Sequence, residues 1–240
     1  MRPYTERMRF FPRKHTPLIA VLALLPLLSS CGTPPPASLS SALSHSAALL
    51  AHEKSIHMEF ATGSPPPASV IAAESGSGVY AAPDSFSGSF LVGVHGIPLT
   101  VSIVVTDGTA YLKPPLATQF TKGNPGAYGF PNPVAFFNPA QGFPALLRET
   151  TDLHYAGLAS RNGTLEWSVS GSLPNVLLAR ILKTPDIART DAVTYLIDPH
   201  TGMLSTVTVR APLYVASVLT AVTISLDYPT GIPRITPPPS

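Results

Sequence analysis

The chain has 240 residues, of which 45% are hydrophobic and 12% are charged, and its formal net charge is +2. Five of the 15 Lys and Arg and one of the 13 Asp and Glu lie in residues 1–30, so the remainder has a net charge of −2. This balance excludes a basic patch for nucleic acid or for anionic lipid headgroups. The single cysteine excludes an internal disulfide framework, so an apolar core has to stabilise the fold.

The N-terminal 30 residues predict a secretory signal peptide. A basic stretch is followed by an apolar run over 17–28 and by Leu28-Ser29-Ser30-Cys31. The run is too short to span a bilayer, which takes about 20 apolar residues. Leu, two small residues and Cys look like the lipobox cleaved by bacterial lipoprotein signal peptidase. We expect cleavage before Cys31 and acylation of Cys31, which would anchor the protein at the outer face of the cell membrane. The alternative is an ordinary signal peptide with an incidental cysteine.

Composition divides the rest of the chain into three parts. Residues 31–37 contain three consecutive prolines and predict an extended tether. Residues 38–230 predict one domain, and 231–240 an irregular proline-rich tail. The domain opens with helical spacing over 39–54.

Alternating apolar and polar residues then predict strands. The clearest segments are 56–60, 86–94, 99–105, 110–112, 165–169, 193–197, 203–209 and 222–228. Asp107-Gly108 and Asn162-Gly163 predict tight hairpin turns. Residues 113–137 predict a long irregular loop, of the kind often used as a lid or binding loop. Asn138-Pro139 can begin a helix, although Pro144 places the regular turns near itself, and 174–182 is a short apolar helix candidate.

About ten strand-like segments and only about three short helices indicate an α+β domain dominated by an antiparallel sheet. With so few helices to cover it, the sheet either packs on itself or lines a cavity with part of its apolar face. The close packing of protein interiors favours the closed core when the strand pattern is considered alone.

No pattern of catalytic or metal-binding residues is visible. The chain lacks a Gly-x-Ser-x-Gly elbow and a phosphate-binding loop. His45, His52 and His57 have no cysteine available to complete a zinc site, so solvated surface histidines are the simpler interpretation. We therefore expect no enzyme, no metal and no cofactor.

Several segments, in order and spacing, resemble the LppX/LprG-type lipoproteins of mycobacteria and related actinobacteria. These are Cys31, the helix ending near 55–58, 104–111, 137–139 before Leu146-Leu147, 163–171 with Trp167, and 192–197 before Met203-Leu204. The resemblance covers about residues 38–230. The irregular stretch at 114–137 departs from it.

The resemblance implies a strongly curved antiparallel half-barrel, LolA-like, with helices over one side and an apolar cavity. It also implies a carrier that binds acylated lipids or glycolipids and moves them across the cell envelope, in contact with a membrane lipid transporter. A structural or interaction lipoprotein with a closed core and no ligand is the alternative. The candidate cavity residues are apolar residues of four predicted strands: Ile56, Met58, Phe60, Phe86, Phe90, Val92, Leu99, Val101, Ile103, Trp167 and Val169.

Overall fold

The computed structural model describes residues 33–129, 131–182 and 187–239. Their strands form one antiparallel sheet of 11 strands in the order β6-β5-β4-β3-β2-β1-β11-β10-β9-β8-β7. The strands are β1 (Ser55–Thr62), β2 (Ala72–Ala81), β3 (Ser85–Val94), β4 (Ile97–Thr106), β5 (Thr109–Lys113), β6 (Thr121–Lys122), β7 (Thr151–Arg161), β8 (Thr164–Pro174), β9 (Thr190–Ile197), β10 (Leu204–Val215) and β11 (Val218–Asp227). The helices are α1 (Leu39–His52), η1 (Pro125–Tyr128), η2 (Pro133–Phe137), α2 (Phe143–Glu149) and α3 (Asn175–Leu178).

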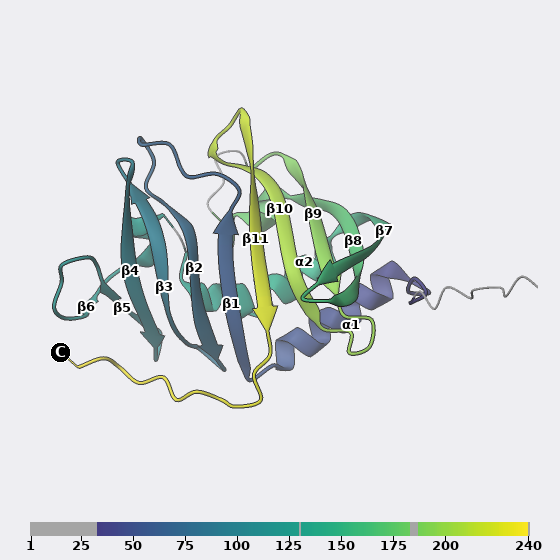
Figure 1. Cartoon of the computed structure of the whole chain (residues 1–240), viewed down its shortest axis with the longest axis horizontal. Helices are drawn as coiled ribbons and strands as arrows, with labels where there is room; N and C mark the ends of the chain where they lie inside the picture. Colours follow the sequence, from purple (N-terminus) through teal and green to yellow (C-terminus); the bar gives the residue numbers. More distant parts are fainter. Residues whose placement is uncertain (1–32, 130, 183–186, 240) are drawn as a thin grey trace, which may run out of the picture. The chain divides into compact units, whose positions relative to one another are not determined.

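The sheet is curved and not closed, because β6 and β7 are its two edges (Figure 1). Two meanders of sequence-adjacent strands, β1–β6 and β7–β11, meet where the first strand pairs with the last. In that ladder Met58 lies opposite Leu226 and Phe60 opposite Ile224. The predicted α+β class with a half-barrel sheet is confirmed.

Turn residues fix the hairpins. Asp107 and Gly108 both have positive φ, as do Asn162 and Gly163, which is the geometry of a two-residue turn between twisted strands. The side chain of Ser38 accepts a hydrogen bond from the backbone N–H of Ser41 and so caps the first turn of α1.

The helices cover the two meanders differently. α1 packs on α2 and contacts β7 and β10, while α3 contacts β8. On the other meander, the short η2 contacts β3. In Figure 1 α1 and α2 lie on the same side of the sheet. Regular helices therefore cover the β7–β10 half, and the 123–137 segment covers the β1–β3 half.

Most sequence-predicted elements are confirmed, with boundaries shifted by a few residues. The regular turns expected near Pro144 are confirmed, because α2 begins at Phe143. The Asn138 side chain accepts hydrogen bonds from the N–H groups of Ala140 and Gln141 in the turn before it. The short helix expected within 174–182 is present and is four residues long. The 113–137 loop is not wholly irregular, because it contains β6, η1 and η2.

Besides β6, two strands have no counterpart among the predicted segments. β2 carries Gly76 and Gly78 where strand alternation would place inward-facing side chains. The rings of Phe90 and Phe86 lie over these two glycines. An added Cβ at Gly76 would come within 2.4 Å of the Phe90 ring. β7 has two register shifts against β8 that disrupt its alternation.

Candidate functional site

A cavity of about 470 Å³ lies at the end of the sheet where β1 stops and β2 begins. Among the described residues, sixteen line it, and none of these is charged. They are Phe60, Thr62, Ser69, Val70, Ile71, Ala72, Ala73, Phe90, Gly126, Ala127, Gly129, Pro131, Phe136, Leu182, Leu213 and Tyr214. The volume falls within the range typical of small-molecule sites, which are concave and mostly apolar.

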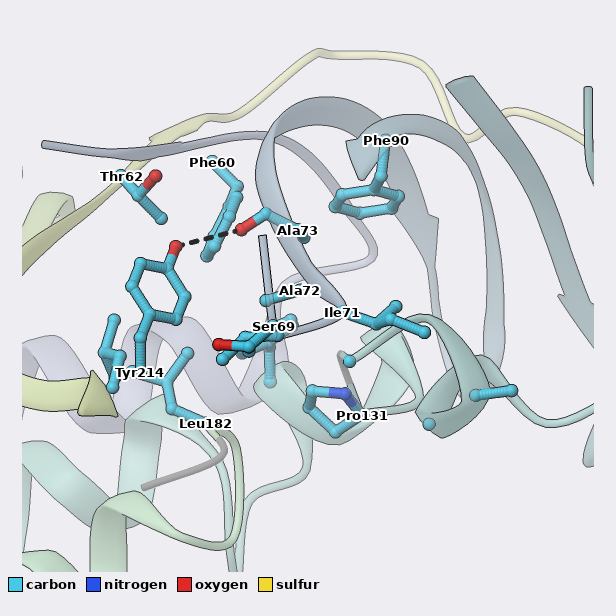
Figure 2. A pocket seen from close by; sticks show the side chains of 16 residues that line it. Phe60, Thr62, Ser69, Ile71, Ala72, Ala73, Phe90, Pro131, Leu182 and Tyr214 are labelled. Atoms are coloured by element: carbon cyan, nitrogen blue, oxygen red, sulfur yellow. Dashed lines mark hydrogen bonds between the residues drawn. The ribbon is translucent and has the colours of Figure 1, made fainter. Parts of the chain in front are cut away.

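Several strands and two connecting segments form the wall of this cavity (Figure 2). Phe60 and Phe90 come from β1 and β3, and their rings meet edge to face at 6.4 Å. Leu213 and Tyr214 come from β10, whose last residues lie at the same end of the sheet because neighbouring strands are antiparallel. The remaining lining residues come mainly from the β1–β2 connection and from the segment around η1 and η2.

The segment that covers the cavity is held by local caps and by one close approach. The side chains of Asn124 and Asn132 accept hydrogen bonds from the N–H groups of Gly126 and Val134, starting η1 and η2. Gly129 has φ +78°, and a Cβ there would come within 2.1 Å of the carbonyl oxygen of Ile71. The cover can therefore contact β2 this closely only with glycine at position 129.

Three hydroxyl groups provide the polar side chains of the wall. Tyr214 donates to the carbonyl of Ala73 at 3.3 Å. The Thr62 hydroxyl shares its one proton between the carbonyl oxygens of Ser64 and Glu74, which lie 2.9 and 3.1 Å away. Burial raises the pKa of Tyr214, the nearby Glu74 carboxylate raises it further, and hydrogen bonding with Thr62 offsets part of the rise. The cavity wall at Tyr214 is therefore uncharged at neutral pH, but the Glu74 carboxylate acts on it electrostatically.

In the β7–β10 half of the sheet, the space between the strands and the covering helices is filled by packed side chains. Leu43 and Leu50 of α1 and Leu146 of α2 are 1–2% exposed and pack with Leu173 and Leu178 in one hydrophobic cluster. Within this half, Thr150 donates its hydroxyl proton to the carbonyl of Leu146 at 2.7 Å. The Tyr195 hydroxyl lies 2.8 Å from Thr150 and must be the donor in that pair.

Comparison with known proteins identifies the family. The family model described as LppX_LprAFG lipoprotein matches residues 37–226. The chain belongs to this lipoprotein family. A search of curated protein sequences finds no match.

Solved structures support the same assignment at the level of the fold. The structure of LprF from Mycobacterium bovis is 17% identical, with a TM-score of 0.64, and the match covers 85% of this chain and 99% of LprF. The lipoprotein LppX of Mycobacterium tuberculosis is 13% identical, with a TM-score of 0.58 and coverage of 81% and 98%. A LolA superfamily protein from Nitrosomonas europaea matches with a TM-score of only 0.27, at 8% identity over 80% and 92% of the two chains, so the comparison rests on the mycobacterial structures.

Two of the eleven candidate cavity residues, Phe60 and Phe90, line the cavity. Seven others are fully buried in the hydrophobic cluster and are not among the lining residues: Ile56, Met58, Phe86, Val92, Val101, Ile103 and Val169. Leu99 is partly exposed. Trp167 is partly buried and donates its indole N–H to the carbonyl of Pro34 at 2.9 Å, in the proline-rich segment. Contact of these nine residues with lipid stays a prediction.

Most of the wall comes from residues that the alternation of strands does not indicate. Residues 69–72 and 126–136 are connections, and their only sequence signal is the length and Pro/Gly content of the 113–137 stretch. Leu213 and Tyr214 extend β10 beyond its predicted end at 209.

Other features bear on chemistry and on the membrane. Among the described residues, no group of three or more His, Cys, Asp or Glu side chains could hold a metal ion. No helix of the described part is long and apolar enough to cross a bilayer. Cys31 and the predicted signal peptide lie outside the described residues.

Proposed function

We propose that this protein is a membrane-anchored lipoprotein that binds an acylated lipid in its apolar cavity and carries it across the cell envelope. The observation that carries the proposal is the cavity itself, an apolar space with no charged lining residue in one half of a half-barrel whose other half is filled. Acyl chains bind through burial of methylene groups, each contributing about 0.8 kcal/mol. Such a wall suits a hydrocarbon chain better than a polar metabolite.

A carrier must also exchange its ligand with a membrane, and one hairpin suits this step. The tip of the β10–β11 hairpin follows directly on Leu213 and Tyr214 of the cavity wall. Val218 and Leu219 in it are 54% and 56% exposed. No charged residue occurs between Arg210 and Asp227. Exposed apolar residues grouped next to a cavity are typical of surfaces that contact membranes or partner proteins.

Anchoring is proposed to occur through acyl chains on Cys31. The support is the Leu28-Ser29-Ser30-Cys31 sequence and membership of a lipoprotein family. Two or more acyl chains suffice for stable attachment without a spanning helix. Cys31→Ala should abolish labelling by a radioactive fatty acid and shift the protein to the soluble fraction. Unchanged labelling of the variant would contradict the anchor.

Lipid binding is tested on the full chain carrying Cys31→Ala, so that no attached acyl group enters the measurement. The protein is purified, extracted with organic solvent, and the extract is analysed by mass spectrometry. About one equivalent of lipid per protein is expected. A clean extract, together with no uptake of added acyl lipid by the extracted and refolded protein, would favour the structural or interaction lipoprotein with a closed core.

A further inference from the structure

The size of the cavity limits what it can hold. Cavities in proteins provide a scale: an apolar cavity of about 150 Å³ accepts benzene, which corresponds to about 25 Å³ per carbon atom. At that scale the 470 Å³ of this cavity accommodates one chain of about 18 carbons. A second chain of similar length would find no space, because the adjoining half of the sheet is packed with the side chains of α1, α2 and α3.

The hydroxyl groups of the wall limit the polar part of the ligand. Tyr214 and Thr62 donate their protons to backbone carbonyls, so towards a ligand they offer acceptor lone pairs. Ser69 is exposed and makes no hydrogen bond with the described residues, so it is free to donate or accept. Donors and acceptors of this kind match a hydroxyl or an ester.

The electrostatics of the same wall select against an anion. None of the lining residues that the structure describes is a Lys, Arg or His that could pair with a carboxylate or a phosphate. The Glu74 carboxylate contributes to raising the pKa of Tyr214, and it would repel a ligand carboxylate beside this tyrosine in the same way.

We infer that the cavity takes a single-chain lipid with an uncharged polar head, of the monoacylglycerol class, with the head next to Ser69 and Tyr214. This inference rests on the proposed lipid-binding function and narrows it. A lipid with two chains would leave one of them in water, and a free fatty acid would bring a carboxylate to a wall without a cation.

Three probes that share one acyl chain separate these properties. Delipidated full chain carrying Cys31→Ala is loaded with a fluorescent apolar dye, which is then displaced by 1-monopalmitoylglycerol, by palmitate or by 1,2-dipalmitoylglycerol. We expect monopalmitoylglycerol to bind at least about tenfold more tightly than either of the other two, a difference of about 1.4 kcal/mol. In a series of monoacylglycerols, affinity should rise to about 18 carbons and then stop rising.

A filling substitution shows that the chain occupies this cavity. Leu213→Trp places a larger ring in the wall and should move the length optimum to shorter chains. Leu165→Trp is the matched control, because Leu165 is 49% exposed on β8 and does not line the cavity. The acyl-chain length that binds most tightly to the Leu165→Trp variant should equal that of the parent protein.

Tyr214→Phe combined with Ser69→Ala should reduce the preference for monopalmitoylglycerol over palmitate without changing the chain-length optimum.

The outcomes distinguish the inference from the function on which it rests. Equal or tighter binding of dipalmitoylglycerol, or a length optimum unmoved by Leu213→Trp, would overturn the single-chain assignment and leave lipid binding intact. Tighter binding of palmitate than of monopalmitoylglycerol would overturn the uncharged head. Failure of every acyl probe to displace the dye would overturn both this inference and the proposed function.

Discussion

The two halves of the sheet have similar strands but differ in what lies against their inner faces. Over β7–β10, helices α1, α2 and α3 insert leucines, and the side chains of the strands pack against them. Over β1–β3 the cover is a segment of short 3₁₀ turns that reaches the sheet at a glycine and leaves about 470 Å³ unfilled. A regular helix supplies a continuous apolar stripe every turn, whereas a proline- and glycine-rich segment supplies few side chains. The cavity therefore arises because a segment of 3₁₀ turns, and not a regular helix, covers this half of the sheet.

Truncating a leucine in each half gives the largest expected contrast. Leu173→Ala in the filled half should lower the free energy of unfolding by about 2–5 kcal/mol, because it leaves a void among packed side chains. Leu213→Ala in the cavity wall removes a partly buried group next to existing space and should cost less than about 1.5 kcal/mol. Urea unfolding of both variants measures the difference. Similar losses would mean that the two halves are equally well packed.

Enlarging a side chain defines where the filled region ends. Val92 is fully buried on β3 and does not line the cavity, so Val92→Trp should overfill the core and cost about 1–3 kcal/mol or more. Leu213→Trp should leave the stability of the delipidated protein nearly unchanged while reducing the lipid that copurifies. Thermal unfolding alongside lipid extraction compares them. A stable Val92→Trp variant that has lost its lipid would instead extend the cavity along β3 from Phe90 to Val92.

Gly129 tests the cover itself. Gly129→Ala puts a Cβ into the carbonyl of Ile71 at a positive φ, so it should cost about 1 kcal/mol or more and lift the cover from β2. Faster exchange of bound lipid with vesicles is the expected functional effect. Gly163→Ala is the control, since it also has a positive φ but an added Cβ meets no atom within 4 Å. Equal lipid exchange in the two variants would show that the close approach does not restrain the cover.

A pair of tyrosines sharpens the comparison at alkaline pH. Burial raises the pKa of Tyr195, partly offset by its hydrogen bond with Thr150, above the ordinary value of 10.0. Above pH 10.0 the unfolded chain ionises this tyrosine and the folded chain does not, so stability is complete below that pH and is lost as the pH rises. Tyr195→Phe should cost about 1 kcal/mol at neutral pH and flatten the alkaline loss. Tyr214 is only half-buried, so Tyr214→Phe should have a smaller effect on the stability at neutral pH and on its loss at alkaline pH. Urea unfolding of both variants at several pH values measures these two effects.

The smallest expected effect on stability is at the hairpin tip. Val218→Ser with Leu219→Ser should change the free energy of unfolding by less than about 0.5 kcal/mol, because both side chains are exposed. Transfer of lipid to vesicles should nevertheless slow. Vesicle cosedimentation and a transfer assay check this, with Ile97→Ser on the β3–β4 tip as an exposed control. Unchanged transfer would remove the hairpin from the proposed membrane contact.

The strands with strict alternation could be predicted from the sequence, because burial of one face imposes a period of two. The residues of β1, β3 and β4 show this directly. β2 could not be predicted in this way, because Gly76 and Gly78 carry no side chain. Phe90 and Phe86 of the neighbouring β3 cover the inner face of the sheet at these two positions. That contact is visible only once the register of the two strands is known.

Less of the candidate site than of the fold could be predicted, because most of the cavity wall comes from connections without periodicity. Alternation identifies which residues face inward, and two of the candidates that it gives, Phe60 and Phe90, line the cavity. It does not say whether side chains or a cavity lie opposite, because this depends on the path of a connection such as 123–137. Helical periodicity is absent there, and the closest contact of that path is made by the backbone of Gly129.

The pairing of the first strand with the last has a consequence for biogenesis. Each meander consists of contacts between neighbours in sequence, but the ladder that joins them places His57 opposite Asp227. If the chain emerges from a translocation channel N-terminus first, β1–β5 can assemble while β11 is still inside. During that interval β1 is an open strand edge, and such edges recruit other chains. Glu59, exposed in the middle of β1, places a charge on this edge and would discourage mispairing until the final strand arrives. A chain stopped before residue 218 would keep the edge permanently and would be expected to aggregate.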